Sequence, residues 1–219
     1  GLTSSGSATL SASGNIGQGQ SQAGRIAVTG NFTATAANPV TAANLNIVLP
    51  NTLNAINGTV SLAAVGNIFF TNSVNTILGR AAVNSVGSAP SQNIDIQIVG
   101  AGRTLTLTGS GAIINGNNIN LRANGDILGT TASQIVGGNL AIASDAGSVG
   151  SSSAPIVVRS IGTLAVRAAQ DITINGAGTF ANGVLVPSSL NIGTVFNQSP
   201  AGGSVTGITA GGNIGLFLG

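Results

Sequence analysis

The stretch Leu121-Arg-Ala-Asn-Gly-Asp-Ile127 decides the fold, because its pattern returns at nearly constant spacing. An apolar residue, a short small or polar step and a second apolar residue reappear as Ile142-Ala-Ser-Asp-Ala-Gly-Ser-Val149 and Val166-Arg-Ala-Ala-Gln-Asp-Ile172, at offsets of 21 (121 to 142) and 24 residues (142 to 166). Looser copies are Leu10-Ser-Ala-Ser-Gly-Asn-Ile16, Leu62-Ala-Ala-Val-Gly-Asn-Ile68 and Ile208-Thr-Ala-Gly-Gly-Asn-Ile214. A fixed period of about 20 to 50 residues indicates a repeat architecture.

Within the repeat, apolar and polar residues alternate with a period of two, which is the pattern of half-buried strands. Ile94, Ile96 and Ile98 are separated by single polar residues, and Leu105 and Leu107 are separated in the same way. No stretch keeps a helical period over three turns, since Gly or Asn interrupts every candidate. The sequence therefore predicts an all-β protein.

Short strands in a repeat of this length favour a solenoid over a sandwich joined by hairpins. We expect a right-handed parallel β-helix (β-solenoid) with about 20–25 residues and three short strands per coil, forming a single domain over residues 1–219. Pairs such as Gly14-Asn15 and Gly125-Asp126 are expected at corners, because Gly adopts a positive φ without steric cost. Irregular loops are expected near 38–57, 71–91 and 176–204.

Composition narrows the function classes. Charged residues make up 5% of the chain, whereas 42% are hydrophobic, so the chain can bury a core as a disordered chain cannot. Six scattered arginines provide no basic face for nucleic acid. No apolar run reaches the roughly 18 residues that cross a bilayer. We therefore expect neither nucleic-acid binding nor a membrane span.

Catalysis is not expected, because the chain contains no His, Cys, Lys, Glu or Tyr. Aspartate would have to supply all acid–base chemistry, and the four acids, Asp95, Asp126, Asp145 and Asp171, are isolated in sequence. Coils one period apart could stack Asp126 with Asp145, or Asp145 with Asp171, as a catalytic or Ca²⁺-binding pair. The favoured interpretation is that these residues form corners as Asn does elsewhere. We therefore expect no catalytic residue, no metal and no cofactor.

Two sets of residues are candidate surface contacts. Arg122 and Asp126 are four residues apart, as are Arg167 and Asp171, so each pair is expected to form an exposed ion pair across a corner. Phe69 and Phe70 must point to opposite sides of a strand, and one ring is a candidate contact.

The uncharged apolar segment 212–218 resembles an open solenoid end, which needs a cover of further chain or of another subunit. The candidate assembly contacts are Phe70, Ile214, Leu216, Phe217 and Leu218.

The step of alternating strand, Gly-Asn or Gly-Asp and Ile, with the later Pro155-Ile156-Val157, resembles the repeats of filamentous-haemagglutinin-like exoproteins of bacteria. The resemblance is strongest over Ile119 to Ile174. Members of that family are long repetitive β-helical proteins, many exported by two-partner secretion, that act as adhesins or surface fibres. The resemblance implies an extracellular or cell-surface building block that associates with itself, end to end or within a longer repetitive chain.

Two other functions stay open at this point. One is a β-helical carbohydrate-active enzyme or phage tailspike, which would need a groove with two or more acids. The other is a glycan-binding adhesin domain that recognises host or environmental glycans through its irregular loops, above all 176–200.

Overall fold

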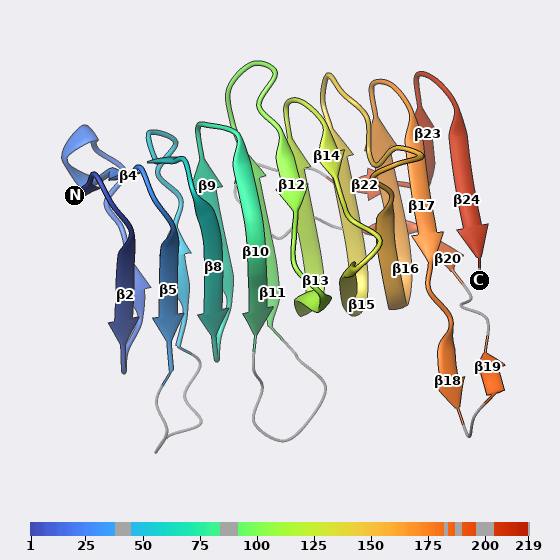
Figure 1. Cartoon of the computed structure of the whole chain (residues 1–219), viewed down its shortest axis with the longest axis horizontal. Coiled ribbons are helices and arrows are strands. Elements are labelled where there is room, and N and C mark those ends of the chain that lie inside the picture. Colours follow the sequence, from blue (N-terminus) through green and yellow to red (C-terminus); the bar gives the residue numbers. More distant parts are fainter. Residues whose placement is uncertain (38–44, 84–91, 182–183, 187–189, 196–203, 219) are drawn as a thin grey trace.

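The computed structural model of the chain describes residues 1–37, 45–83, 92–181, 184–186, 190–195 and 204–218. In these residues the regular structure is almost entirely β-strand, and the one helical element is a short 3-10 turn, η1 (Gln22–Gly24). Figure 1 shows the strands side by side in successive layers from the N-terminal to the C-terminal side. The prediction of an all-β protein is confirmed.

The strands in chain order are β1 (Leu2–Ser4), β2 (Ala8–Ala12), β3 (Ile16–Gly17), β4 (Ile26–Val28), β5 (Phe32–Ala36), β6 (Ile47–Leu49), β7 (Ala55–Ile56), β8 (Thr59–Ala64), β9 (Ile68–Asn72), β10 (Thr76–Val83), β11 (Asn93–Ile98), β12 (Leu105–Leu107), β13 (Gly111–Ala123), β14 (Ile127–Leu128), β15 (Ser133–Ser144), β16 (Ile156–Ala168), β17 (Ile172–Gly176), β18 (Thr179–Ala181), β19 (Val184–Val186), β20 (Asn191–Ile192), β21 (Thr194–Val195), β22 (Val205–Thr206), β23 (Ile208–Ala210) and β24 (Ile214–Leu218).

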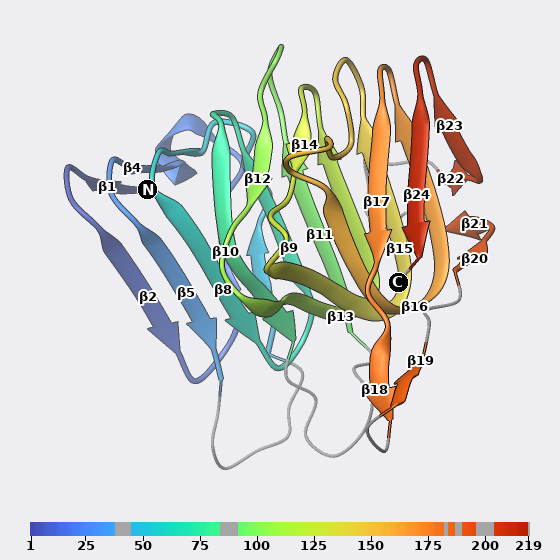
Figure 2. The same ribbon diagram turned by 45° about the vertical axis from the view of Figure 1, so that its right-hand side comes forward.

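Most strands belong to one 17-stranded sheet, and β1, β4 and β7 form a second, three-stranded parallel sheet. Each strand of these two sheets pairs with strands from neighbouring circuits of the chain, and one such circuit is called a coil here (Figure 2). Leu121 of β13 pairs in parallel with Ile142 of β15, and Ile142 pairs with Val166 of β16. The sequence repeat is therefore also the hydrogen-bonding register. This large parallel sheet is compatible with a β-helix.

Two of the looser copies of the repeat mark a different corner of the coil, whereas the third, which ends at Ile214, pairs with the close copies. Ile16 and Ile68, which end two of these copies, lie in a row that continues to Ile119. Ile127 and Ile172, which end two of the close copies, lie in a separate row joined through Val149. One sequence pattern thus serves two corners, because both need a strand end, a tight turn and a buried apolar residue that starts the next strand.

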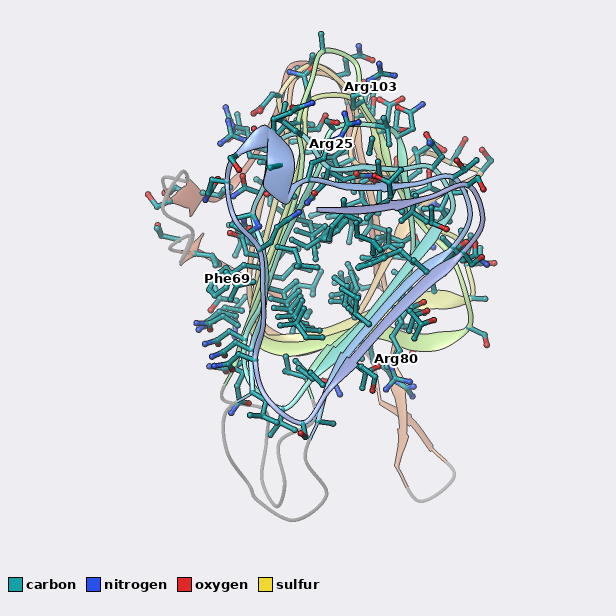
Figure 3. The ribbon with its side chains drawn as sticks, turned by 90° about the vertical axis from the view of Figure 1, so that its left-hand side faces the viewer. Arg25, Phe69, Arg80 and Arg103 are labelled. Carbon is teal, nitrogen blue, oxygen red and sulfur yellow. The ribbon has the colours of Figure 1, made fainter. Side chains whose placement is uncertain are left out.

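Inward side chains stack in rows along the sheet and form one continuous core. Figure 3 views this core end-on, in the direction in which the coils stack. Fully burying each large aliphatic side chain contributes about 1.5–3 kcal/mol. Phe70 belongs to this core and is 1% exposed, whereas Phe69 points outward (Figure 3). The expected assembly contact at Phe70 is therefore wrong, because strand alternation places Phe70 in the inward row with its partner Ile96.

The corner glycines do not use the backbone freedom that we predicted for them. Gly14 and Gly125 have no positive φ; the described glycines that have one are Gly100, Gly102, Gly109, Gly111, Gly150 and Gly207. Gly125 is needed for close packing instead, since the Cβ of any other residue would lie 2.7 Å from the carbonyl oxygen of Gly102.

Asparagine side chains link the coils at one corner. In the first three links, Oδ1 of one residue accepts the backbone N–H of the next at 2.7–2.8 Å, and in the last two it accepts the side-chain Nδ2–H at 2.8 Å. The residues in order are Asn15, Asn46, Asn67, Asn93, Asn118 and Asn139. The predicted role of Asn at corners is thus a hydrogen-bonding role, which satisfies polar groups that a turn would otherwise leave unpaired.

The loops expected near 38–57 and 71–91 are narrower than predicted. β6 and β7 lie within the first stretch and β10 within the second, and all three pair in parallel with neighbouring coils. The short runs 47–49 and 55–56 were missed because they are too brief to show an alternation. Residues 38–44 and 84–91 lie outside the described part.

The stretch 176–204 contains the antiparallel pair β18–β19, the parallel strand β20 and β21, which pairs antiparallel with β22 just beyond the stretch. Val195 of β21 and Val205 of β22 pack against the outward side chains Ala141, Ala143 and Ala165. The β18–β19 pair therefore lies outside the main sheet, and β21 and β22 cover part of its outer face.

Candidate functional site

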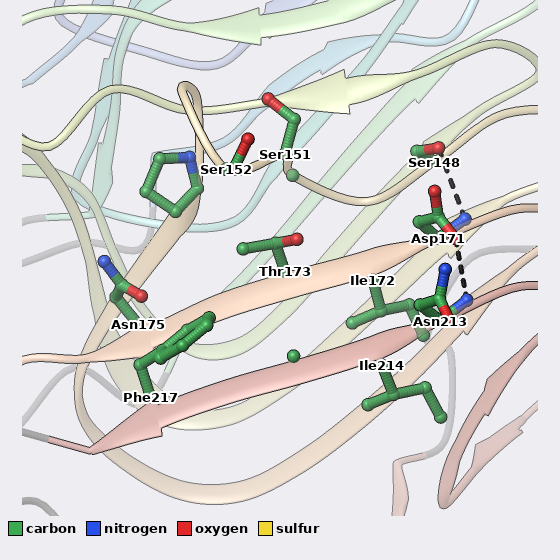
Figure 4. A pocket seen from close by; sticks show the side chains of 13 residues that line it. Ser148, Ser151, Ser152, Asp171, Ile172, Thr173, Asn175, Asn213, Ile214 and Phe217 are labelled. Carbon is green, nitrogen blue, oxygen red and sulfur yellow. Dashed lines mark hydrogen bonds between the residues drawn. The ribbon is translucent and has the colours of Figure 1, made fainter.

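A hollow of about 720 Å³ lies on the outer face of the sheet, against β17, β24 and residues of the loop 150–155 (Figure 4). β17 and β24 pair in parallel, with Thr173 beside Gly215 and Asn175 beside Phe217. Strand alternation turns these four residues outward, since the intervening residue Ile174 is buried in the core. The hollow is therefore built on a rigid paired surface.

One side of this hollow is formed by polar residues of successive coils at a single corner. The backbone N–H of Asp171 donates to Oγ of Ser148 at 3.3 Å, and Oδ1 of Asp171 accepts the backbone N–H of Asn213 at 2.7 Å (Figure 4). Ser148 is itself fixed, because its backbone N–H donates to Oδ1 of Asp126 at 2.7 Å. These bonds set the direction of the Asp171 carboxylate.

Phe217 lies between this hollow and a second one of about 350 Å³, because Phe217 and Asn175 line both. The second hollow continues to Thr131 and Val157. Phe217 is 60% exposed. Its ring lies against Gly215, where an added Cβ would come within 3.1 Å of it. The two hollows with Phe217 between them are called the outer groove below.

The outer groove carries little charge. Its described lining contains hydroxyl groups, amide groups and one carboxylate, that of Asp171, but no arginine. The chemistry available there is hydrogen bonding to an uncharged ligand together with apolar contact at Phe217.

A second candidate surface is the edge of β24. In the described part of the chain β24 pairs with β17 on one side only. Ile214 and Leu216 continue the buried rows of Ile172 and Ile174, yet they are 48% and 38% exposed. Leu218 is 56% exposed. Four of the five residues that sequence reasoning named as assembly contacts therefore gather here.

The ion pairs join different partners from those predicted. Nε of Arg122 lies 2.9 Å from Oδ2 of Asp145, and Nη2 of Arg167 lies 2.8 Å from Oδ1 of the same carboxylate. Register explains this, because Ala143 pairs with Arg122 on one side and with Arg167 on the other. Asp145, two residues after Ala143, is therefore within reach of both arginine side chains. The predicted partners Asp126 and Asp171 lie around the corner and accept backbone N–H groups instead.

The acidic residues do not gather. Asp95 is buried and accepts a hydrogen bond from Nδ2 of Asn120 at 2.6 Å, while the other three hold the contacts given above. Among the described residues no group of three or more His, Cys, Asp or Glu side chains is placed to hold a metal ion.

Sequence reasoning missed the outer groove, because its residues come from four successive coils between 131 and 218. The recurrence of Ser148, Asp171 and Asn213 directly before Val149, Ile172 and Ile214 was the available signal. It places three polar side chains in one column but does not reveal the hollow beside them.

No protein-family model, no curated protein and no solved structure gives a match to the chain. No helix in the described residues is both long and apolar enough to cross a membrane.

Proposed function

We propose that the chain is a right-handed parallel β-helix that serves as a structural building block of an extracellular bacterial fibre or adhesin. In this proposal it associates end to end with further copies or forms part of a longer repetitive chain. The resemblance of its repeats to filamentous-haemagglutinin-like exoproteins supports the location and the setting, and the parallel register supports the coil.

The observation that carries the proposal is the continuity of the inward rows. Ile172 and Ile174 are buried beneath β24, whereas Ile214 and Leu216, which continue the same rows, are half exposed. Covering each of these side chains with one more coil would contribute roughly 1 kcal/mol, and the backbone groups of β24 would gain partners. A coil from the same chain or from a second copy meets both needs.

A structural role also accords with the acidic residues, which hold coils together in the described structure. Asp126 and Asp171 accept backbone N–H groups of the next coil, and Asp145 joins two arginines of different coils. We therefore propose a non-enzymatic function rather than that of a carbohydrate-active enzyme or tailspike, whose catalysis would need a cluster of free acids.

Electron microscopy of the purified 219-residue chain, combined with light scattering, tests this proposal. We expect filaments of uniform width, and three-dimensional maps of them give the handedness of the coil. Leu216→Asp should abolish filaments by placing a charge in the row, whereas Thr131→Asp, which adds the same charge at an exposed turn, should leave them intact. Monodisperse short rods of the unmodified chain would contradict assembly between copies.

A further inference from the structure

The outer groove carries an inference that goes beyond a structural role. We propose that the outer groove binds an uncharged oligosaccharide, with one part of the ligand in each hollow and Phe217 between them.

The shape of the outer groove fits an extended ligand. The hollows of about 720 and 350 Å³ share Phe217 and Asn175, so they form one elongated depression rather than two separate sites. It runs from the corner residue Asp171, past Thr173, to Val157 on the far side. Small-molecule sites usually occupy about 300–1,000 Å³, so each hollow is large enough for part of a chain of sugar rings.

The polar groups of the outer groove match hydroxyl-rich molecules. Serine and threonine hydroxyls both donate and accept, and the amide of Asn175 offers both functions in one plane. Asp171 is held by the N–H of Asn213 through a single oxygen, and a carboxylate accepts more than one hydrogen bond. Sugar hydroxyls need this mixture of donors and acceptors at fixed positions.

Phe217 supplies the apolar contact. Its ring is 60% exposed and rests on Gly215, where the absence of a side chain leaves room for it. An exposed aromatic ring in a polar hollow is unfavourable in water. It would be covered by the C–H face of a pyranose ring, which is apolar and of similar size.

The charge of the outer groove selects against acidic ligands. No arginine lines either hollow, and Asp171 is the one charged residue in the described lining. A phosphate, sulfate or uronate group would meet this carboxylate without a compensating cation. Neutral saccharides pay no such cost, so the site is assigned to them.

Isothermal titration calorimetry with cellopentaose, maltopentaose and mannopentaose tests the proposal, with pentagalacturonate as the acidic probe. At least one neutral pentasaccharide should bind saturably, and the acidic probe should not. Phe217→Ala should weaken the binding by about tenfold, which corresponds to roughly 1.4 kcal/mol. Phe69→Ala, which removes an outward ring far from the groove in sequence and outside its lining, is the matched control and should bind like the unmodified chain.

Ser152→Trp is a second variant, which tests the larger hollow without changing a residue of β24. Ser152 lies in the loop over the larger hollow and is exposed, so a tryptophan there fills the hollow without disturbing the sheet and should abolish binding. The proposal is overturned if none of the neutral probes binds, or if Phe217→Ala and Ser152→Trp bind as the unmodified chain does. Electron microscopy of the same samples keeps this outcome separate from that of fibre assembly.

Discussion

In residues 1–72 the strands are two to six residues long and asparagine side chains are buried where the chain turns, whereas in residues 111–168 the strands β13, β15 and β16 run for 12 or 13 residues. The N-terminal region buries Asn51, Asn54 and Asn72 completely. The later strands bend at glycines that stack in register, such as Gly116 on Gly137.

The difference shows two solutions to one problem. A turn interrupts the backbone ladder, and in the N-terminal region a buried amide replaces the missing bonds. Oδ1 of Asn54 accepts the N–H of Ile26 at 2.8 Å, and its Nδ2 donates to the carbonyl oxygen of Thr71 at 3.0 Å. At the stacked glycines Gly116 and Gly137 the β13–β15 ladder continues around the bend, and the Asn118 and Asn139 side chains that follow bond to other side chains rather than to the backbone.

The largest effect is expected where a buried amide is removed. Asn54→Leu keeps the approximate size but leaves the N–H of Ile26 and the carbonyl of Thr71 without their partner, each at about 1–3 kcal/mol. We expect the free energy of unfolding in urea to fall by about 3–5 kcal/mol. Asn57→Leu, at an exposed position, is the control and should change it by less than about 0.5 kcal/mol. Equal losses in both variants would contradict this account of the N-terminal corners.

An intermediate effect is expected at the glycine bend. The Cβ introduced by Gly137→Ala would collide with the carbonyl oxygen of Gly116, and such overpacking costs about 1–3 kcal/mol. Gly14→Ala is the matched variant, because a Cβ there meets no atom within 4 Å. Thermal and urea unfolding of the two variants should therefore differ by at least about 1 kcal/mol. If Gly137→Ala unfolds like the unmodified chain, close packing is not what the bend requires.

The smallest effect is expected at the surface ion pairs. Asp145→Asn removes the charge that Arg122 and Arg167 share, and partly exposed pairs of this kind contribute 0 to about 1 kcal/mol. The loss should shrink further in 1 M salt, because the Debye length is then about 3 Å. A loss of more than about 2 kcal/mol, or one that does not respond to salt, would mean that Asp145 acts through backbone contacts instead.

Sequence reasoning succeeded where a single period controls both the pattern and the register. Leu121, Ile142 and Val166 were aligned from their spacing alone and are neighbours in the sheet. Sequence reasoning failed where ion-pair partners come from different coils. Arg122 pairs with Asp145 of the next coil, because its predicted partner Asp126 is near in sequence but lies beyond a corner. The same limit applies to the outer groove, since a hollow depends on how far a loop stands from the sheet, which residue types alone do not encode.

The pairing of β16 with two separate strands, β20 and β23, has a practical consequence. Thr163 pairs with Asn191 of β20, whereas Val166 pairs with Ile208 of β23, so the buried rows continue although β21 and β22, which lie between these strands in sequence, form a separate sheet. Because the entropy of closing a loop rises only with the logarithm of its length, the segment that contains β21 and β22 could be lengthened at small cost. The coil between β20 and β23 is therefore a permissive site for a reporter or cargo domain, displayed laterally without disturbing the scaffold that carries it.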